Sequence, residues 1–155
     1  MTQPAARPRL IDATLLRRVF GVLGPAEALA SMAAFLITLT AGSWSWGQIP
    51  SPTLLTMASG TAFAAIVLGQ LANAYACRSQ TQPIWRTFTR PNRLLVISIA
   101  AEAILLLLML VVPPIARALG GAFPSALGWA CALCAIPTVW LADSTHKAFR
   151  RKRRR

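Results

Sequence analysis

The sequence is poor in charged residues, acids above all, and it lacks the common catalytic motifs. Charged side chains make up 13% of its 155 residues, against about 25% in soluble domains, and only 4 residues are acidic. A Gly-rich phosphate loop, a Gly-x-Ser-x-Gly motif and a His/Cys cluster are missing. Three cysteines in a chain this size form no disulfide framework. These absences argue against catalysis by this chain alone, and we expect no cofactor and no metal.

Long apolar stretches occupy most of the chain instead. The apolar fraction is 55% and the mean hydropathy is +0.55. A membrane-spanning helix needs about 20 mainly apolar residues, and four windows qualify: 19–41, 53–77, 94–116 and 126–146. Because nothing alternates with period 2, a barrel is disfavoured. The sequence predicts an all-α membrane protein whose domain, 19–147, is a four-helix antiparallel bundle between an N-terminal segment, 1–18, and a basic tail, 148–155.

The basic residues predict how this bundle is oriented. Fifteen of the 16 Lys and Arg lie before the first window, between the second and third, or after the fourth, and Arg117 alone lies on the other side. Basic loops stay in the cytoplasm, so we expect both termini there, in the inner (plasma) membrane. The tail directly follows a span, which favours a topological and lipid-binding role over nucleic acid. Trp44 and Trp46, in an uncharged loop on the opposite side, suit an interfacial belt.

Two acids lie well inside the predicted spans. Carboxylates within a membrane are functional candidates by default. Glu27 is about two turns into the first span, where we expect water or an arginine such as Arg18 or Arg78 to reach it. Glu102 lies deeper in the Leu- and Ile-rich third span, which we expect to face lipid. A protonated, hydrogen-bonded carboxyl is the structural interpretation of Glu102.

The end of the fourth span carries further candidates of less weight. Asp143 lies near the cytoplasmic end, where it can pair with Lys147 at position i+4. Cys131 and Cys134 have the spacing of metal ligands. The single histidine, His146, is three turns away. Cysteine is also an ordinary small residue of packed helices, which we favour over a metal site.

A polar pair, Gln70 and Asn73, lies in the second span. The two residues are three positions apart and therefore share a helix face. Small residues recur along the same span at a spacing that permits close helix contact. We therefore predict that this helix is the interior one and that the pair faces protein. Gln70 and Asn73 have two interpretations: they form an interhelical hydrogen bond, or they coordinate a cation.

Four segments follow one another in a recognisable order: RPRLIDATLLRRVF, VLGQLANAYACRSQ, PIWRTFTRPNRLL and VVPPIARALGGAFPSALGW. Their order and spacing resemble those of the last four membrane helices of P-type cation-transporting ATPases of the calcium-pump type, and the resemblance covers nearly the whole chain. The second segment is similar to the eighth helix of that family, where a Gln or Glu precedes an Asn by three residues. The resemblance implies that Gln70, with Asn73 beside it, is a peripheral cation-site residue.

The same resemblance implies which parts of a pump are missing. The phosphorylated Asp-Lys-Thr-Gly-Thr motif, the nucleotide domain and the fourth to sixth helices are not in this sequence. The implied function is non-catalytic support of ion transport, with the lipid bilayer and the remainder of a P-type ATPase, or a second copy, as partners. A split pump's second piece, a gene remnant and an independent protein all agree with these residues. The alternative function is a stand-alone small carrier or regulatory helix bundle.

Overall fold

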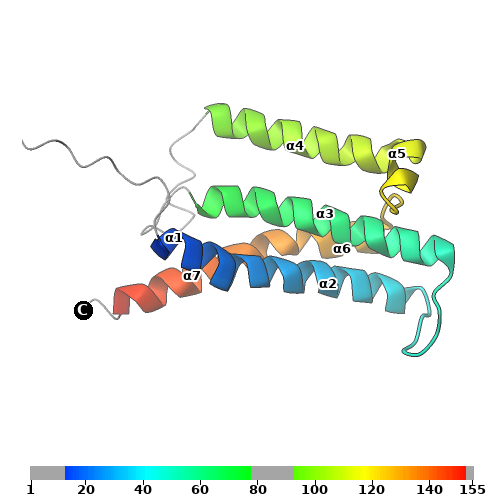
Figure 1. The fold of residues 1–155 in the computed structure, drawn as a ribbon, viewed down its shortest axis with the longest axis horizontal. Coiled ribbons are helices and arrows are strands. Elements are labelled where there is room, and N and C mark those ends of the chain that lie inside the picture. The colour runs from blue at the N-terminus through cyan, green and yellow to red at the C-terminus, as the bar shows by residue number, and fades with distance from the viewer. Residues whose placement is uncertain (1–12, 78–92, 153–155) are drawn as a thin grey trace, which may run out of the picture.

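The computed structural model describes residues 13–77 and 93–152, and the regular structure in these ranges is entirely helical. Figure 1 shows the helices running side by side along one long axis. Their bounds are α1 Ala13–Arg18, η1 Val19–Leu23 (a π-helical turn), α2 Gly24–Ala41, α3 Pro52–Ala76, α4 Arg93–Val111, α5 Pro113–Ala118, α6 Ala126–Leu133 and α7 Ala135–Lys152.

Four helical stretches are long and apolar enough to cross a membrane. They are Leu16–Ala41, Pro52–Ala76, Arg93–Val111 and Ala126–Phe149. The first combines the end of α1 with η1 and α2, and the last combines α6 with α7. The predicted fold class, an all-helical membrane protein with four spans, is therefore confirmed.

Proline and serine decide where several of these helices begin. Ser51 and Ser125 are the N-caps of α3 and α6, and their hydroxyl oxygens accept hydrogen bonds from Leu54 N (3.3 Å) and Gly128 N (3.1 Å). Such caps satisfy backbone donors that have no partner inside the helix. At the end of α4, Val112 is extended before the first of two prolines, as expected for a residue that precedes proline. The predicted window 94–116 is thus divided between α4 and α5.

The first span is also distorted by a proline near its start. Pro25 has no N–H to donate to the carbonyl four residues earlier. Just before it, Gly24 N–H bonds to Val19 O, five residues back, which is the spacing of a π-helix. The wider turn changes the direction in which the residues before it point, and Arg18 is one of them.

Helix α3 is the centre of the bundle, as its small residues predict. It packs against α2, α4, α6 and α7. Gly60 allows close approach, because a β-carbon there would collide with the backbone of Ala122, and Ala122 N donates to Thr56 O at 2.9 Å. At Gly69 a β-carbon would instead meet the side chain of Glu27. Small residues at such crossings are the usual means of packing helices in membranes.

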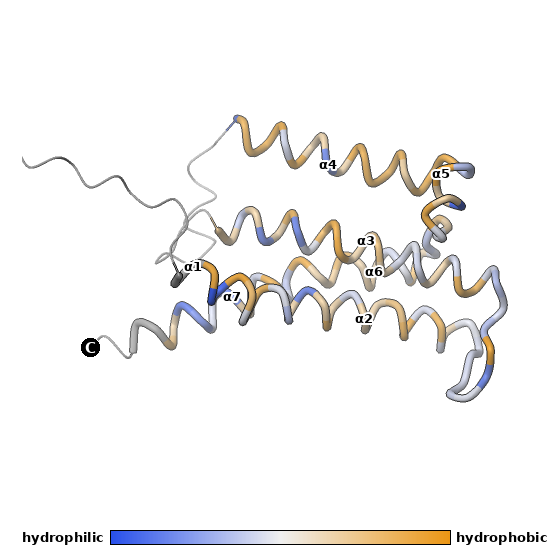
Figure 2. Tube along the Cα trace, in the orientation of Figure 1, coloured by the Kyte–Doolittle hydropathy of each residue, from blue (hydrophilic) through white to orange (hydrophobic). Residues whose placement is uncertain are grey.

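Helix α4 lies along one side of the bundle and is the least covered of the four spans. Its buried residues are Leu106 and Leu110, which join the main apolar core with alanines of α2, α3, α6 and α7. Figure 2 shows a mainly hydrophobic α4. An apolar helix with so much exposed surface suits contact with lipid, in agreement with its Leu- and Ile-rich sequence.

Candidate functional site

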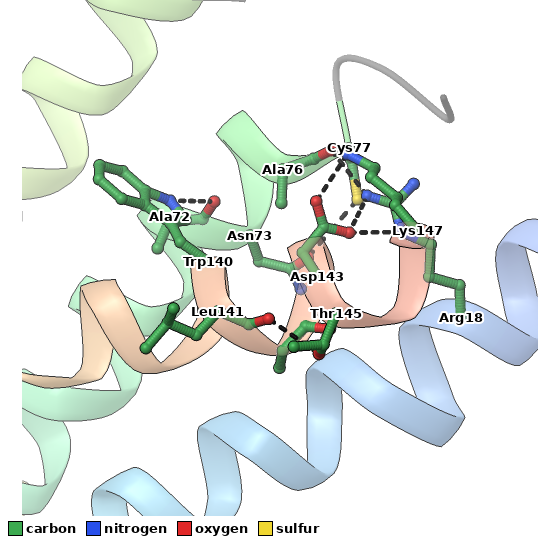
Figure 3. A network of polar contacts seen from close by, with 11 residues as sticks. Arg18, Ala72, Asn73, Ala76, Cys77, Trp140, Leu141, Asp143, Thr145 and Lys147 are labelled. Atoms are coloured by element: carbon green, nitrogen blue, oxygen red, sulfur yellow. Dashed lines mark hydrogen bonds and ion pairs between the residues drawn. The ribbon is translucent and has the colours of Figure 1, made fainter. Parts of the chain in front are cut away.

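A buried ionic cluster joins three helices at one end of the bundle, here called the Arg18 end. Asp143 on α7 is fully buried, and Arg18 and Lys147 are only 3% and 5% exposed. Arg18 Nε donates to Asp143 Oδ1 at 2.8 Å, and Arg18 Nη2 contacts the same oxygen. Lys147 Nζ lies 2.6 Å from Asp143 Oδ2 (Figure 3). One carboxylate therefore serves two cations.

The last turn of α3 supplies a further partial negative charge to the two cations of this cluster. The carbonyl oxygen of Ala76 accepts from Arg18 Nη2 at 2.8 Å and from Lys147 Nζ at 3.4 Å. The last carbonyls of a helix lack internal partners and carry partial negative charge, so cations are favourable there. One turn earlier, Trp140 Nε1 donates to Ala72 O at 3.2 Å. The cluster thus caps α3 with side chains from two other helices.

Asp143 has a larger role in the structure than the sequence predicted. The pairing with Lys147 is confirmed. Arg18, however, comes from 125 residues away and makes Asp143 the centre of a three-helix contact. The antiparallel order of the predicted spans already places Arg18 and Asp143 at the same end, which is the signal that could have suggested the pair.

The thiol of Cys77 lies beside this cluster, at the C-cap of α3. Cys77 Sγ is 3.5 Å from Asn73 Oδ1. Partial desolvation raises the pKa of the Cys77 thiol, against the opposing effect of the Arg18 charge. The thiol is accordingly held in its neutral, less reactive form.

A second polar contact lies deeper, between α2 and α3. Gln70 Nε2 donates to Glu27 Oε1 at 2.9 Å. Glu27 is buried, whereas Gln70 is exposed over the rest of its surface. The expected pairing of Glu27 with Arg18 is wrong, because Asp143 holds that guanidinium. Arg78, the other expected partner, lies outside the described residues.

The remaining predicted residues do not join this contact in the same way. Asn73 is half-buried and accepts from Cys77 rather than reaching Glu27. Glu102 lies on the exposed surface of α4. Of the predicted pair, then, Gln70 makes the interhelical hydrogen bond and Asn73 a local one.

No metal-binding group of side chains is formed within residues 13–77 and 93–152. In those ranges, no three His, Cys, Asp or Glu side chains come close enough to hold a metal ion. Cys131 is half-buried and Cys134 is exposed, and neither is in a disulfide. Cys131 packs against the main apolar core, and Cys134 is the exposed C-cap of α6.

Four spans, three of them joined by a buried ionic cluster at one end, define a multi-pass helical membrane domain. The family model for the C-terminus of cation transporting ATPases matches residues 1–149, and the chain belongs to this family. The matched range includes all four spans and every residue of both polar contacts. No curated protein matches the chain.

Proposed function

We propose that this chain is a non-catalytic supporting module of a calcium-pump-type cation ATPase, with both termini in the cytoplasm. The observation that carries the proposal is the family match over residues 1–149. The phosphorylation motif and nucleotide domain are absent from this sequence. Energy from ATP must then come from chain segments outside it, and the role left to these helices is to hold the transport domain in place.

The use of polar groups in the bundle supports a scaffolding role. The charged groups of the buried cluster hold α1, α3 and α7 together at the Arg18 end. These groups are Arg18, Asp143 and Lys147. Interhelical contacts of this kind orient helices, since each hydrogen bond contributes roughly 0.6 to 2 kcal/mol in membranes. In our proposal the Arg18 end faces the cytoplasm, because the basic tail continues from it.

The exposed side of Gln70 supports contact with further pump helices. An amide facing hydrocarbon is costly unless it is paired, and Gln70 uses one amide hydrogen on Glu27 while its side chain remains exposed. A neighbouring transport helix would cover it. In that setting the Gln70 carbonyl oxygen becomes available as a hydrogen-bond acceptor or as a peripheral cation ligand.

Co-purification tests the module directly. A tagged full chain, extracted from its native membrane in mild detergent, should carry with it a polypeptide that contains the Asp-Lys-Thr-Gly-Thr motif. Gln70→Leu should weaken this association, whereas Thr145→Val, on the exposed face of α7, should not. A monodisperse chain without such a partner contradicts the proposal. Ion flux through liposomes that contain the chain alone, without ATP, would instead favour a stand-alone carrier.

The proposed orientation has its own test. Single cysteines at positions 5 and 46, in a chain whose natural cysteines are replaced by alanine, are treated with a membrane-impermeant maleimide in intact cells. The Trp46→Cys variant should be labelled, and Ala5→Cys should be labelled only after the membrane is opened. The reverse pattern would overturn the orientation without affecting the family assignment.

A further inference from the structure

An apolar hollow lies at the end of the bundle opposite Arg18, between α3, α4 and α5. Its walls include Ser59 and Phe63 of α3, Met109 and Leu110 of α4, and Leu119 just after α5, and its volume is about 90 Å³. The hollow lies where the chain turns at the prolines after α4, and Gly120, with a φ of 70°, allows the chain to turn back after α5. Its volume is less than the roughly 300 to 1,000 Å³ of a pocket that encloses a whole ligand, so the hollow is a groove that fits part of a chain molecule.

A second hollow continues from the first and brings a charge to it. The two share Leu110, Ala116 and Gly121, and the second, of about 190 Å³, has Arg117 in its wall. Arg117 is exposed, and it is the only Lys or Arg between positions 94 and 146. Between positions 103 and 142 the sequence has no Asp or Glu. A lone cation therefore stands beside a continuous apolar surface.

The apolar hollow and Arg117 follow one another along the bundle as the acyl chain and the headgroup do in a lipid. Helix α4 has 19 residues, about 28 Å of rise, which is close to the thickness of the hydrocarbon core. Arg117 follows the end of α4 by six residues, and we expect it at the level of the polar interface. The loop with Trp44 and Trp46, whose rings are 5.2 Å apart, belongs to the same end of the bundle (Figure 1). The hollow itself lies on the hydrocarbon side of Arg117.

We propose that this place is a binding site for an anionic phospholipid, with the phosphate on Arg117 and an acyl chain in the hollow between α3 and α4. The charge of Arg117 complements a lipid that carries net negative charge, and the apolar walls complement its chain. This inference goes beyond the supporting role proposed above and does not depend on it. The bound lipid would fill the gap beside α4, whose packing on the bundle rests on Leu106 and Leu110.

Photocrosslinking in proteoliposomes tests the site. The full chain is reconstituted with phosphatidylglycerol or phosphatidylcholine, each with a diazirine on one acyl chain, and labelled peptides are mapped by mass spectrometry. Labels from phosphatidylglycerol should concentrate on positions 59–63 and 109–121. One basic residue at the interface is worth about 1 kcal/mol with anionic lipid, so the preference over phosphatidylcholine should be about fivefold.

Three variants separate the parts of the proposal. Arg117→Gln should abolish the fivefold preference, while the matched control Arg17→Gln, an exposed arginine at the opposite end, should leave it unchanged. Ser59→Leu, which fills the hollow, should lower labelling at these positions by both lipids. Equal labelling by the two lipids in the unaltered chain would overturn the role of Arg117. Unchanged labelling in Ser59→Leu would overturn the assignment of the acyl chain to the hollow. Crosslinks between two copies of α4 would show that a second chain occupies this place instead.

Discussion

Removing the negative charge of Asp143 should destabilise the bundle more than any exposed substitution. Asp143→Asn keeps the size of the side chain but leaves Arg18 and Lys147, 3% and 5% exposed, without their carboxylate. The carbonyl of Ala76 still accepts from both cations, yet it carries only a partial charge. The consequence is uncompensated positive charge buried among three helices.

The structure sets the size of this effect. A hydrogen bond to a charged group is worth about 1.5–3 kcal/mol, and Asp143 accepts one from Arg18 and forms an ion pair with Lys147. Removing one partner of a buried ion pair typically costs about 3–5 kcal/mol. An exposed pair would contribute only about 0–1 kcal/mol. We therefore expect Asp143→Asn to lower the free energy of unfolding by about 3–5 kcal/mol.

Reversible unfolding in mixed micelles at increasing SDS fraction measures this loss. Tryptophan fluorescence is a suitable signal, because Trp140 donates to α3 one turn from the cluster. Thr145→Val, on the exposed face of α7, is the matched control and should change the unfolding free energy by less than about 0.5 kcal/mol. A loss below about 1 kcal/mol in Asp143→Asn would refute the burial argument, since that is the range of exposed pairs.

A triple variant tests whether the charges themselves are needed. Replacing Arg18 and Lys147 by Met and Asp143 by Leu removes both cations together with the carboxylate. Buried ion networks replaced by apolar residues of similar volume are often as stable as before or more so. The triple variant should therefore be more stable than Asp143→Asn. If it is less stable, the interaction among the three charges contributes more than their desolvation costs.

Three further predictions concern other contacts. Gly60→Ala should lower the free energy of unfolding by about 1–3 kcal/mol, because the added methyl group collides with the backbone of Ala122. Gly21→Ala, with open space around it, should cause no loss in the same SDS titration. Equal losses in the two variants would contradict the close contact between Gly60 and Ala122. Gln70→Leu should cost roughly 0.6–2 kcal/mol by removing the bond to Glu27, and a stability gain would argue against that bond. Because its pKa is raised, the Cys77 thiol should alkylate with iodoacetamide along a rate–pH curve displaced to higher pH relative to the SDS-unfolded chain. Coincident curves would contradict the shift.

The spans and the family could be predicted from sequence because both depend on local composition and segment order. Four long apolar windows are enough to predict four helices, since a backbone in hydrocarbon must satisfy its own hydrogen bonds. The small residues of α3 likewise indicate its interior place. The divisions of the third and fourth windows are also local, because they lie within a few residues of Pro113 and Pro137.

The sequence by itself determined the helices and the end of the bundle at which each polar group lies. Only the tertiary structure decided the partners: Arg18 with Asp143 rather than Glu27, and Gln70 rather than Asn73 with Glu27. The physical reason is rotation about the helix axis. Each residue turns a side chain by about 100°, so the π-turn before Pro25 and the approach allowed by Gly69 change which groups meet, while each group stays at the same end of the bundle.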